Sequence, residues 1–221
     1  MAEPSILQRR LPFWNQLSEA EQHAISGSRI KETFARCALI SRSAEECKGL
    51  LLLTSGQIRA YILSDAGREI TLFRLRAGDV CVLSASCVLD SIVFDVLIEA
   101  VEETEALLIP SASFHPVVEA NPAVALFMAT TANRRFSDAM RAMQQILFLG
   151  ADRRVTLFLW EELTKTGSPV LFYTHDEIAR LIGSAREVVT RVLKSLSHEG
   201  IVALGRGKLE ILDSEKLKRL V

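Results

Sequence analysis

The chain is poor in cysteine and has no long apolar run, and each scarcity excludes a class of protein. Its 221 residues include four cysteines, without the dense spacing of a small secreted disulfide domain. Its longest apolar runs fall well short of the ~20 residues that a membrane-spanning helix needs. The segment Met1 to Gln22 is mostly polar and does not resemble a secretory signal. The sequence therefore predicts a cytoplasmic protein without a membrane partner.

Histidine is also scarce, and the four histidines all lie outside residues 34–109, a region with strand periodicity. A cupin-like β-roll enzyme binds its metal through clustered ligands, which are usually histidines. This alternative is therefore disfavoured, and we expect neither an enzyme nor a metal site.

Net charge is close to zero, at −1, so a strongly basic nucleic-acid-binding protein is excluded. The charges are nevertheless uneven: from Gly150 onward 12 Lys and Arg stand against 10 Asp and Glu. The residues before it carry 14 basic and 17 acidic side chains. The small positive excess has the sign expected of a C-terminal DNA-binding domain, and tight binding would need two copies of it.

A stretch near the C-terminus has the pattern of two short helices separated by a glycine. Thr174 with Glu177, and Ser184 with Glu187, each match a capping box, in which the hydroxyl accepts the N3 amide and the glutamate returns to the cap. Gly183 lies between them, where a tight turn favours a residue without a Cβ. This pattern is typical of a helix-turn-helix and indicates sequence-specific DNA binding.

The second of these helices has a polar face opposite its valines, formed by Arg186, Glu187, Thr190, Arg191 and Lys194. An arginine fork matches O6 and N7 of guanine in the major groove, and a carboxylate can accept from the amino group of cytosine. We expect Arg186, Glu187 and Arg191 to contact bases. A plainer interpretation remains open, in which Glu187 only completes its capping box and the arginines only face solvent.

A β-hairpin is predicted after the second helix, with strands at 201–204 and 208–212 and the turn Gly205-Arg-Gly207 between them. Such a hairpin is the wing of a winged helix-turn-helix, although it could equally be a plain hairpin that closes the core. Side chains at its tip are suited to phosphate contact. The residues expected to contact the DNA backbone are Arg206, Lys208, Ser184, Thr190 and Thr174.

The N-terminal half changes from helical to strand periodicity. Residues 1 to about 30 resemble short helices, one of them entered at the capping box Ser18-Glu-Ala-Glu21. From Phe34 to Ile109 the chain consists of short apolar strands separated by turns such as Ser64-Asp-Ala-Gly67. Many short strands of this kind predict a small antiparallel roll.

A long helix follows the strands. His115-Pro116 and Asn121-Pro122 mark helix starts, and residues 123–149 contain neither glycine nor proline. Its apolar stripe needs a partner, and we expect a twin helix in a homodimer, with packing on the chain's own roll as the alternative. The residues of the expected dimer stripe are Phe127, Thr131, Phe136, Met140, Met143, Ile146 and Leu147.

The order of these elements resembles that of the Crp/Fnr bacterial transcription regulators. The resemblance covers nearly the whole chain and is most specific at Ser184-Ala-Arg-Glu-Val-Val-Thr-Arg191, since the family's recognition helix typically has the pattern S-R-E-x-x-x-R. Arg186, Glu187 and Arg191 match this pattern, whereas Ala185 stands where the family has serine. It implies a homodimer on palindromic double-stranded DNA, with RNA polymerase as a partner if the protein activates transcription. The expected α+β chain comprises a sensor β-roll (1–115), a dimerisation helix (116–149) and a winged helix-turn-helix (150–221).

The sensor half departs from the best-known members of that family. Cyclic-nucleotide-binding members carry an arginine that grips the cyclic phosphate, whereas no Arg or Lys lies between Arg76 and Arg134 here. A buried phosphate without a cation would be poorly compensated, which argues against cAMP. Iron–sulfur members use N-terminal cysteines, whereas the first cysteine here is Cys37, which argues against that cluster. The effector thus stays unidentified.

Cys81 and Cys87 flank the segment where relatives hold their effector. One hypothesis is a thiol sensor, in which oxidation or a bound metal changes the conformation of the dimer. The other is that both cysteines are small apolar core residues, which their valine and leucine neighbours favour.

Overall fold

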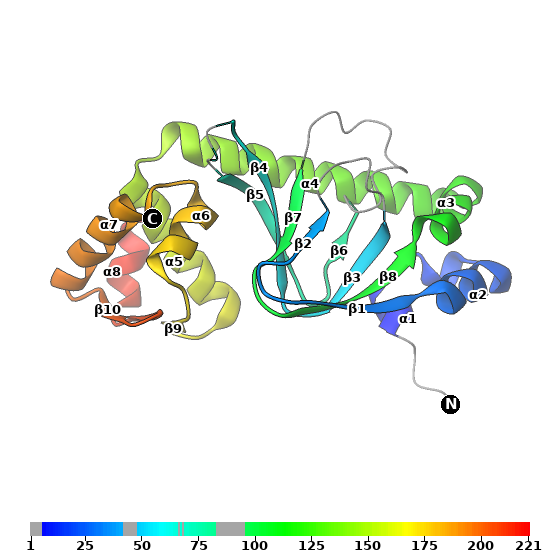
Figure 1. The fold of residues 1–221 in the computed structure, drawn as a ribbon, viewed down its shortest axis with the longest axis horizontal. Helices are drawn as coiled ribbons and strands as arrows, with labels where there is room; N and C mark the ends of the chain where they lie inside the picture. The colour runs from blue at the N-terminus through cyan, green and yellow to red at the C-terminus, as the bar shows by residue number, and fades with distance from the viewer. Residues whose placement is uncertain (1–5, 42–47, 66, 68, 83–95) are drawn as a thin grey trace. The chain divides into compact units, whose positions relative to one another are not determined.

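The computed structural model describes residues 6–41, 48–65, 67, 69–82 and 96–221. Its contacts divide the chain into two compact units, and Figure 1 shows their helices and strands. One unit contains residues 1–62 and 72–139, and the other contains residues 63–71 and 140–221. Helices and antiparallel sheets occur together, so the predicted α+β fold class is confirmed.

The first unit begins with short helices and continues as a β-roll, as predicted. The helices are α1 (Ile6–Arg10), the 3-10 helix η1 (Trp14–Gln16) and α2 (Glu19–Ser28). The strands are β1 (Ile30–Phe34), β2 (Leu39–Ser41), β3 (Gly49–Ser55), β4 (Gln57–Leu63), β5 (Glu69–Arg76), β6 (Val80–Cys81), β7 (Leu97–Ala100) and β8 (Thr104–Pro110).

The strands of the roll form two four-stranded sheets, with the orders β1-β8-β3-β6 and β2-β7-β4-β5. The pairings with described registers are all antiparallel, and they place Leu51 opposite Leu108 and Arg59 opposite Glu99. Neighbouring residues of a strand face opposite sides, so Leu50 and Leu51 contribute to different layers. The predicted antiparallel roll is confirmed.

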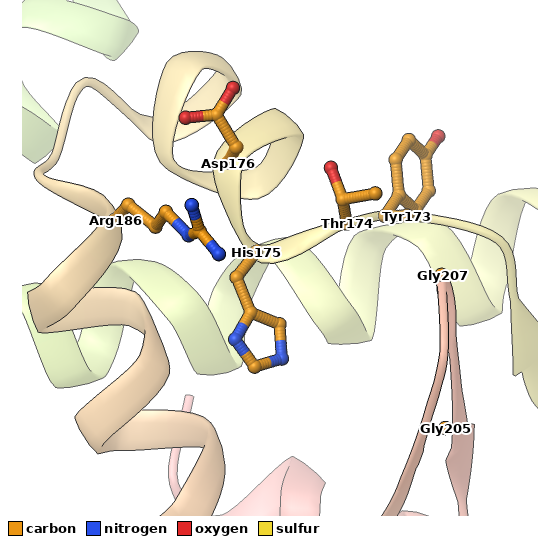
Figure 2. A pocket seen from close by; sticks show the side chains of 7 residues that line it. All are labelled: Tyr173, Thr174, His175, Asp176, Arg186, Gly205 and Gly207. Carbon is orange, nitrogen blue, oxygen red and sulfur yellow. The ribbon is translucent and has the colours of Figure 1, made fainter.

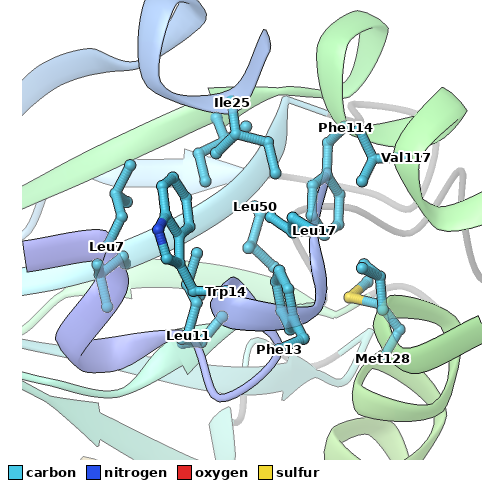
Figure 3. Packing of buried hydrophobic residues seen from close by; sticks show 14 of the residues in the cluster. Leu7, Leu11, Phe13, Trp14, Leu17, Ile25, Leu50, Phe114, Val117 and Met128 are labelled. Atoms are coloured by element: carbon cyan, nitrogen blue, oxygen red, sulfur yellow. The ribbon is translucent and has the colours of Figure 1, made fainter. Parts of the chain in front are cut away.

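One face of the first sheet is covered by helices that precede and follow the β-roll in the chain. Leu50 of β3 and Ile109 of β8 are fully buried in this layer, together with Phe114 of the following helix (Figure 3). The helices pack against this sheet because burial of their apolar faces removes apolar surface from water. Ser18 begins α2 through the predicted capping box, in which its hydroxyl accepts the amide of Glu21.

The long helix is α4 (Pro122–Phe148), which is preceded by α3 (Ser111–Ala120). The prediction that His115-Pro116 marks a helix start is wrong, because Pro116 lies inside α3. The fixed φ of proline suits a helix, and within ten residues it removes only the bond to the carbonyl of Ala112. Asn121 does separate the two helices, since its side chain accepts the amide of Ala123 at the start of α4.

The second unit contains α5 (Ala151–Thr166), β9 (Val170–Leu171), α6 (His175–Ile182), α7 (Arg186–His198), β10 (Val202–Gly205), β11 (Lys208–Ile211) and α8 (Ser214–Arg219). Its three strands form a sheet in the order β10-β11-β9. The core lies between α5, α6, α7 and this sheet, with Val155, Ile178, Val189 and Leu193 fully buried. Within the described part of the chain, no helix is both long and apolar enough to cross a membrane.

Gly56, between β3 and β4, is a position where only glycine fits. Its φ is 77°, and an added Cβ would overlap the carbonyl oxygen of Glu103. We expect Gly56→Ala to lower the free energy of unfolding by about 1–3 kcal/mol, measured by urea denaturation. Gly27 in α2 has open space around it, so Gly27→Ala should instead stabilise the protein by about 0.5–1 kcal/mol. Equal effects of the two changes would contradict this assignment.

Candidate nucleic-acid interface

The first helix of the predicted pair, α6, begins as expected from the sequence. The amide of Glu177 donates to Thr174 Oγ1 at 3.2 Å, and the amide of Thr174 donates to Glu177 Oε2 at 2.7 Å. Both halves of the capping box are therefore formed. Gly183 ends the helix in the left-handed region, with φ 65°. The predicted helix, turn and helix are confirmed.

The second capping box is not formed, which corrects the prediction for Ser184 and Glu187. The amide of Ser184 donates to the carbonyl of Ala179 at 2.9 Å and closes the end of α6. The N-cap of α7 is therefore Ala185, whose methyl group cannot accept a hydrogen bond. Glu187 becomes the second residue of α7 and is exposed. The interpretation that Glu187 only completes a capping box is excluded.

The two faces of α7 separate as its periodicity predicted. Val189 and Leu193 are fully buried against the core, and Leu196 is nearly so. Arg186, Glu187, Arg191 and Lys194 are exposed, and together with the half-buried Thr190 they line a groove of about 430 Å³. This arrangement presents donors and acceptors on a single helical face, as recognition of base edges requires.

A second groove, of about 470 Å³, lies between α6, α7 and the hairpin (Figure 2). Arg186 borders this groove as well as the first one. The absence of side chains at two hairpin glycines leaves room for a ligand to approach the backbone. The lining residues are Tyr173, Thr174, His175, Asp176, Arg186, Gly205 and Gly207.

His175 is a residue of this interface that the sequence interpretation missed. Its Nδ1 lies 2.9 Å from Oγ1 of Thr190 on α7, so the imidazole joins the two helices. Burial lowers the pKa of His175, and the cations Arg186 and Lys194 lower it further. The only feature of the sequence that could have indicated a role for His175 is its position directly after Thr174, the N-cap of α6.

Two partly buried side chains, Arg154 and Tyr173, hold α6 in place. Arg154 of α5 donates from Nη1 to the carbonyl oxygens of Ile182 at 3.1 Å and Gly183 at 3.2 Å. The hydroxyl of Tyr173 donates to Oε2 of the buried Glu162 at 2.8 Å. The helix-turn-helix is thus attached to α5 at both ends of α6, which keeps the exposed face of α7 in a fixed orientation.

The hairpin after α7 is formed as predicted, by antiparallel β10 and β11. Gly205 pairs with Lys208, and Gly207 adopts a φ of 68° at the tip. Arg206 and Lys208 are both exposed there. The hairpin strands also bury Val202 and Leu209 in the core, so the two alternative roles of this hairpin are compatible.

The long helix α4 carries an apolar row on its exposed side. Phe136, Met140, Met143 and Leu147 are 63%, 43%, 44% and 69% exposed, and they recur at steps of four, three and four residues. This spacing is that of the a and d positions of a coiled coil. Phe127 does not belong to the row, because its ring packs edge-on against Phe13, 5.0 Å away. Thr131 and Ile146 are half-buried.

The sensor candidates Cys81 and Cys87 differ in what the structure describes. Cys81 lies in β6 and is 1% exposed, whereas Cys87 lies outside the described residues. Sequence inspection also missed a cation, because Arg59 is buried in β4 and forms an ion pair with Glu99 at 2.8 Å. Among the described residues, no cluster of three or more His, Cys, Asp or Glu could hold a metal ion.

Comparison with known proteins matches both halves of the chain. A model of the cyclic nucleotide-binding domain matches residues 31–121, and a model of the Crp-like helix-turn-helix domain matches residues 153–220. The cyclic AMP receptor protein of Thermus thermophilus is 31% identical over 173 residues, which are 78% of this chain and 79% of that protein. Transcriptional regulator LdrP of the same organism is 31% identical over 84% of this chain and 94% of its own length.

A solved structure extends the match to the whole fold. The crystal structure of a Crp/Fnr-family protein from Eubacterium rectale is 43% identical and covers 96% of this chain and 98% of its own. The TM-score between the two is 0.88. The chain therefore belongs to the Crp/Fnr family of transcription regulators, and its C-terminal domain is a DNA-binding helix-turn-helix.

Proposed function

We propose that this regulator acts as a homodimer on a palindromic DNA site and that its affinity is set by a signal at the β-roll. The observation that carries the proposal is the exposed polar face of α7 above a fully buried apolar one. Two such helices related by twofold symmetry would contact two half-sites one helical turn apart.

The proposed roles of the DNA-binding residues follow from their positions. Arg186, Glu187 and Arg191 contact base edges, because they are exposed on the face of α7 that can enter the major groove. The remaining residues contact phosphates and set the register without carrying sequence information. They are Thr174, Ser184, Thr190, Arg206 and Lys208.

The proposed dimer forms through α4. The four apolar side chains of its exposed row are too large to leave in water without a partner, and their heptad spacing matches a twin helix. We therefore restrict the seam to Phe136, Met140, Met143 and Leu147. Dimerisation also supplies the second half-site contact that a domain of low net charge needs.

The signal that we propose is not cAMP, although several relatives are named as a cyclic AMP receptor protein or as cAMP-activated regulators. A cyclic phosphate needs a cation, and two cations of the sensor unit already have carboxylate partners. Arg59 bonds to Glu99 at 2.8 Å, and Arg135 of α4 bonds to Asp138 at 3.1 Å. Burial of Cys81 favours its role as a core residue, since a reactive thiol needs access to solvent.

Selection of bound DNA fragments tests this proposal. The full chain is equilibrated with random duplexes under reducing and under oxidising conditions, and the retained fragments are sequenced. We expect a palindromic site that is lost in Arg186→Ala. Equal binding in both conditions agrees with cysteines that take no part in sensing, whereas a difference abolished by Cys81→Ser or Cys87→Ser would establish the thiol-sensor alternative. Retention of no sequence, or of a non-palindromic one, would overturn the proposed function.

A further inference from the structure

His175 lies where α6, α7 and the groove beside the hairpin meet. We propose that its imidazole is a proton-dependent contact to the DNA backbone, so that each protomer binds DNA more tightly when His175 is protonated. The inference rests on the proposed function, because it concerns the same DNA-binding surface. It adds a property that neither the fold nor the base-contacting residues imply, namely a DNA affinity that depends on pH.

The imidazole of His175 lies between Thr190, to which it is hydrogen-bonded, and the groove beside the hairpin. Nδ1 is held 2.9 Å from Oγ1 of Thr190, whereas the ring also borders the groove of about 470 Å³. Figure 2 shows the Arg186 side chain extending from α7 toward His175, with Gly207 of the hairpin across the groove. A groove bordered by a cation and by glycine backbone suits a phosphate group.

Hydrogen-bonding capacity at this point changes with one proton. In neutral His175, one ring nitrogen donates and the other accepts, and Nδ1 is committed to Thr190. If Nδ1 donates, protonation turns Nε2 from an acceptor into a donor. If Nδ1 accepts, protonation reverses the bond and frees the hydroxyl proton of Thr190. Either way the interface gains a donor and loses an acceptor, and phosphate oxygens only accept.

The charged groups around His175 favour its neutral form before DNA arrives. On α7, Arg186 and Lys194 face the imidazole and lower its pKa, after the larger effect of burial. On α6, Asp176 borders the same groove but forms an ion pair with Arg180 at 3.4 Å. The hairpin contributes Gly205 and Gly207 to the groove. Arg206, which lies between these glycines in the chain, is exposed and does not line the groove.

Bound DNA favours the protonated form of His175 instead, because its phosphates place negative charge next to the imidazole. An opposite charge at this range raises a histidine pKa, so the pKa of the bound state exceeds that of the free state. Binding then takes up a proton. Affinity is highest below the free-state pKa and falls as the pH rises through the bound-state value, by up to about tenfold per pH unit for each protomer.

The experiment is a fluorescence anisotropy titration of the full chain with the selected palindromic duplex, at constant ionic strength, from about pH 5.8 to 7.8. We expect wild-type affinity to fall at least about fivefold over this range. His175→Gln should bind weakly with a flat pH profile, and His175→Arg should bind tightly with a flat profile, since arginine keeps its charge. His198→Gln, which removes an exposed histidine at the end of α7, is the matched control and should keep the wild-type profile.

The outcomes separate this inference from the function on which it rests. A wild-type profile that is flat on a palindromic site overturns the proton-linked contact and leaves the proposed function intact. A slope that persists in His175→Gln assigns the proton to another group and also overturns it. If His175→Gln binds too weakly to measure, the profile of His175→Arg decides: flat supports the inference, and sloped contradicts it. Failure to obtain any palindromic duplex would instead remove the proposed function.

Discussion

Replacing Met143 by glutamate is expected to separate the two protomers and to abolish specific DNA binding. Met143 lies in the middle of the exposed row on α4, at a d-type position between Met140 and Leu147. In a twofold dimer the new carboxylate of each protomer would lie in the apolar seam, close to the equivalent carboxylate of the partner. Both carboxylates would lose their hydration there. Like charges in an apolar seam are among the strongest disruptions of a coiled coil, so the dimer should dissociate.

The expected consequence for DNA binding is large because each protomer of the proposed dimer would contact only one half-site. Specific binding by a dimer typically exceeds non-specific binding by at least about 10³-fold, and a monomer loses most of that advantage. Analytical ultracentrifugation should give a monomer mass, and anisotropy should show a loss of at least about a thousandfold in affinity. The folded domains should persist, since Met143 is exposed in the isolated chain.

Arg141 supplies the control for this experiment. It is exposed on the same helix, two residues before Met143, and lies off the heptad row. Arg141→Glu changes the charge by more than Met143→Glu does, so a general electrostatic effect on DNA binding would be larger there. If Arg141→Glu dissociates the dimer as well, or if Met143→Glu leaves it intact, the proposed seam is wrong.

The second large effect is expected at Arg191. Removal of its guanidinium by Arg191→Ala should cost about 1–3 kcal/mol at each half-site and relax the preference at one base pair. Both half-sites of a palindrome carry the change, so the total loss for the dimer is about twice this value. Affinities for single-base variants of the selected site, measured at one salt concentration, give both quantities.

Lys208 provides the contrasting variant. It is exposed near the hairpin tip, where we propose that it contacts phosphates rather than the base edges assigned to α7. Lys208→Ala should weaken all sequences by a similar factor and reduce the slope of affinity against salt by about one for each protomer. Identical, uniform losses in Arg191→Ala and Lys208→Ala would show that the division into base and phosphate contacts is wrong.

Local patterns were sufficient for most of the fold. The Thr174 capping box, the glycine turn at Gly183 and the buried row of α7 depend on residues close together in the chain. The prediction of a capping box at Ser184 was wrong because the ends of two neighbouring helices compete for the same backbone amide. The amide of Ser184 closes α6 and so cannot also donate to Glu187, and α7 begins one residue later, with Ala185 as its N-cap.

Contacts between distant residues could not be predicted from the sequence. His175 meets Thr190 across 15 residues, and Arg59 meets Glu99 across 40. Neither pair has a spacing that marks it, because sheet register and helix packing determine which side chains meet. For the same reason Phe127 was assigned to the dimer stripe, although its periodicity fits equally well the contact that it makes with Phe13.

The alanine at the start of α7 suggests a trade between stability and activity. Serine or aspartate at position 185 would cap the helix and stabilise the domain by about 0.5–2 kcal/mol relative to alanine. Either side chain would also occupy the amide groups at the end of the helix that carries Arg186, and aspartate would add a negative charge where DNA must approach. Selection for thermal stability alone should therefore favour aspartate at this position, whereas selection for DNA binding should favour a small, uncharged residue, either alanine as here or the serine of the family's pattern.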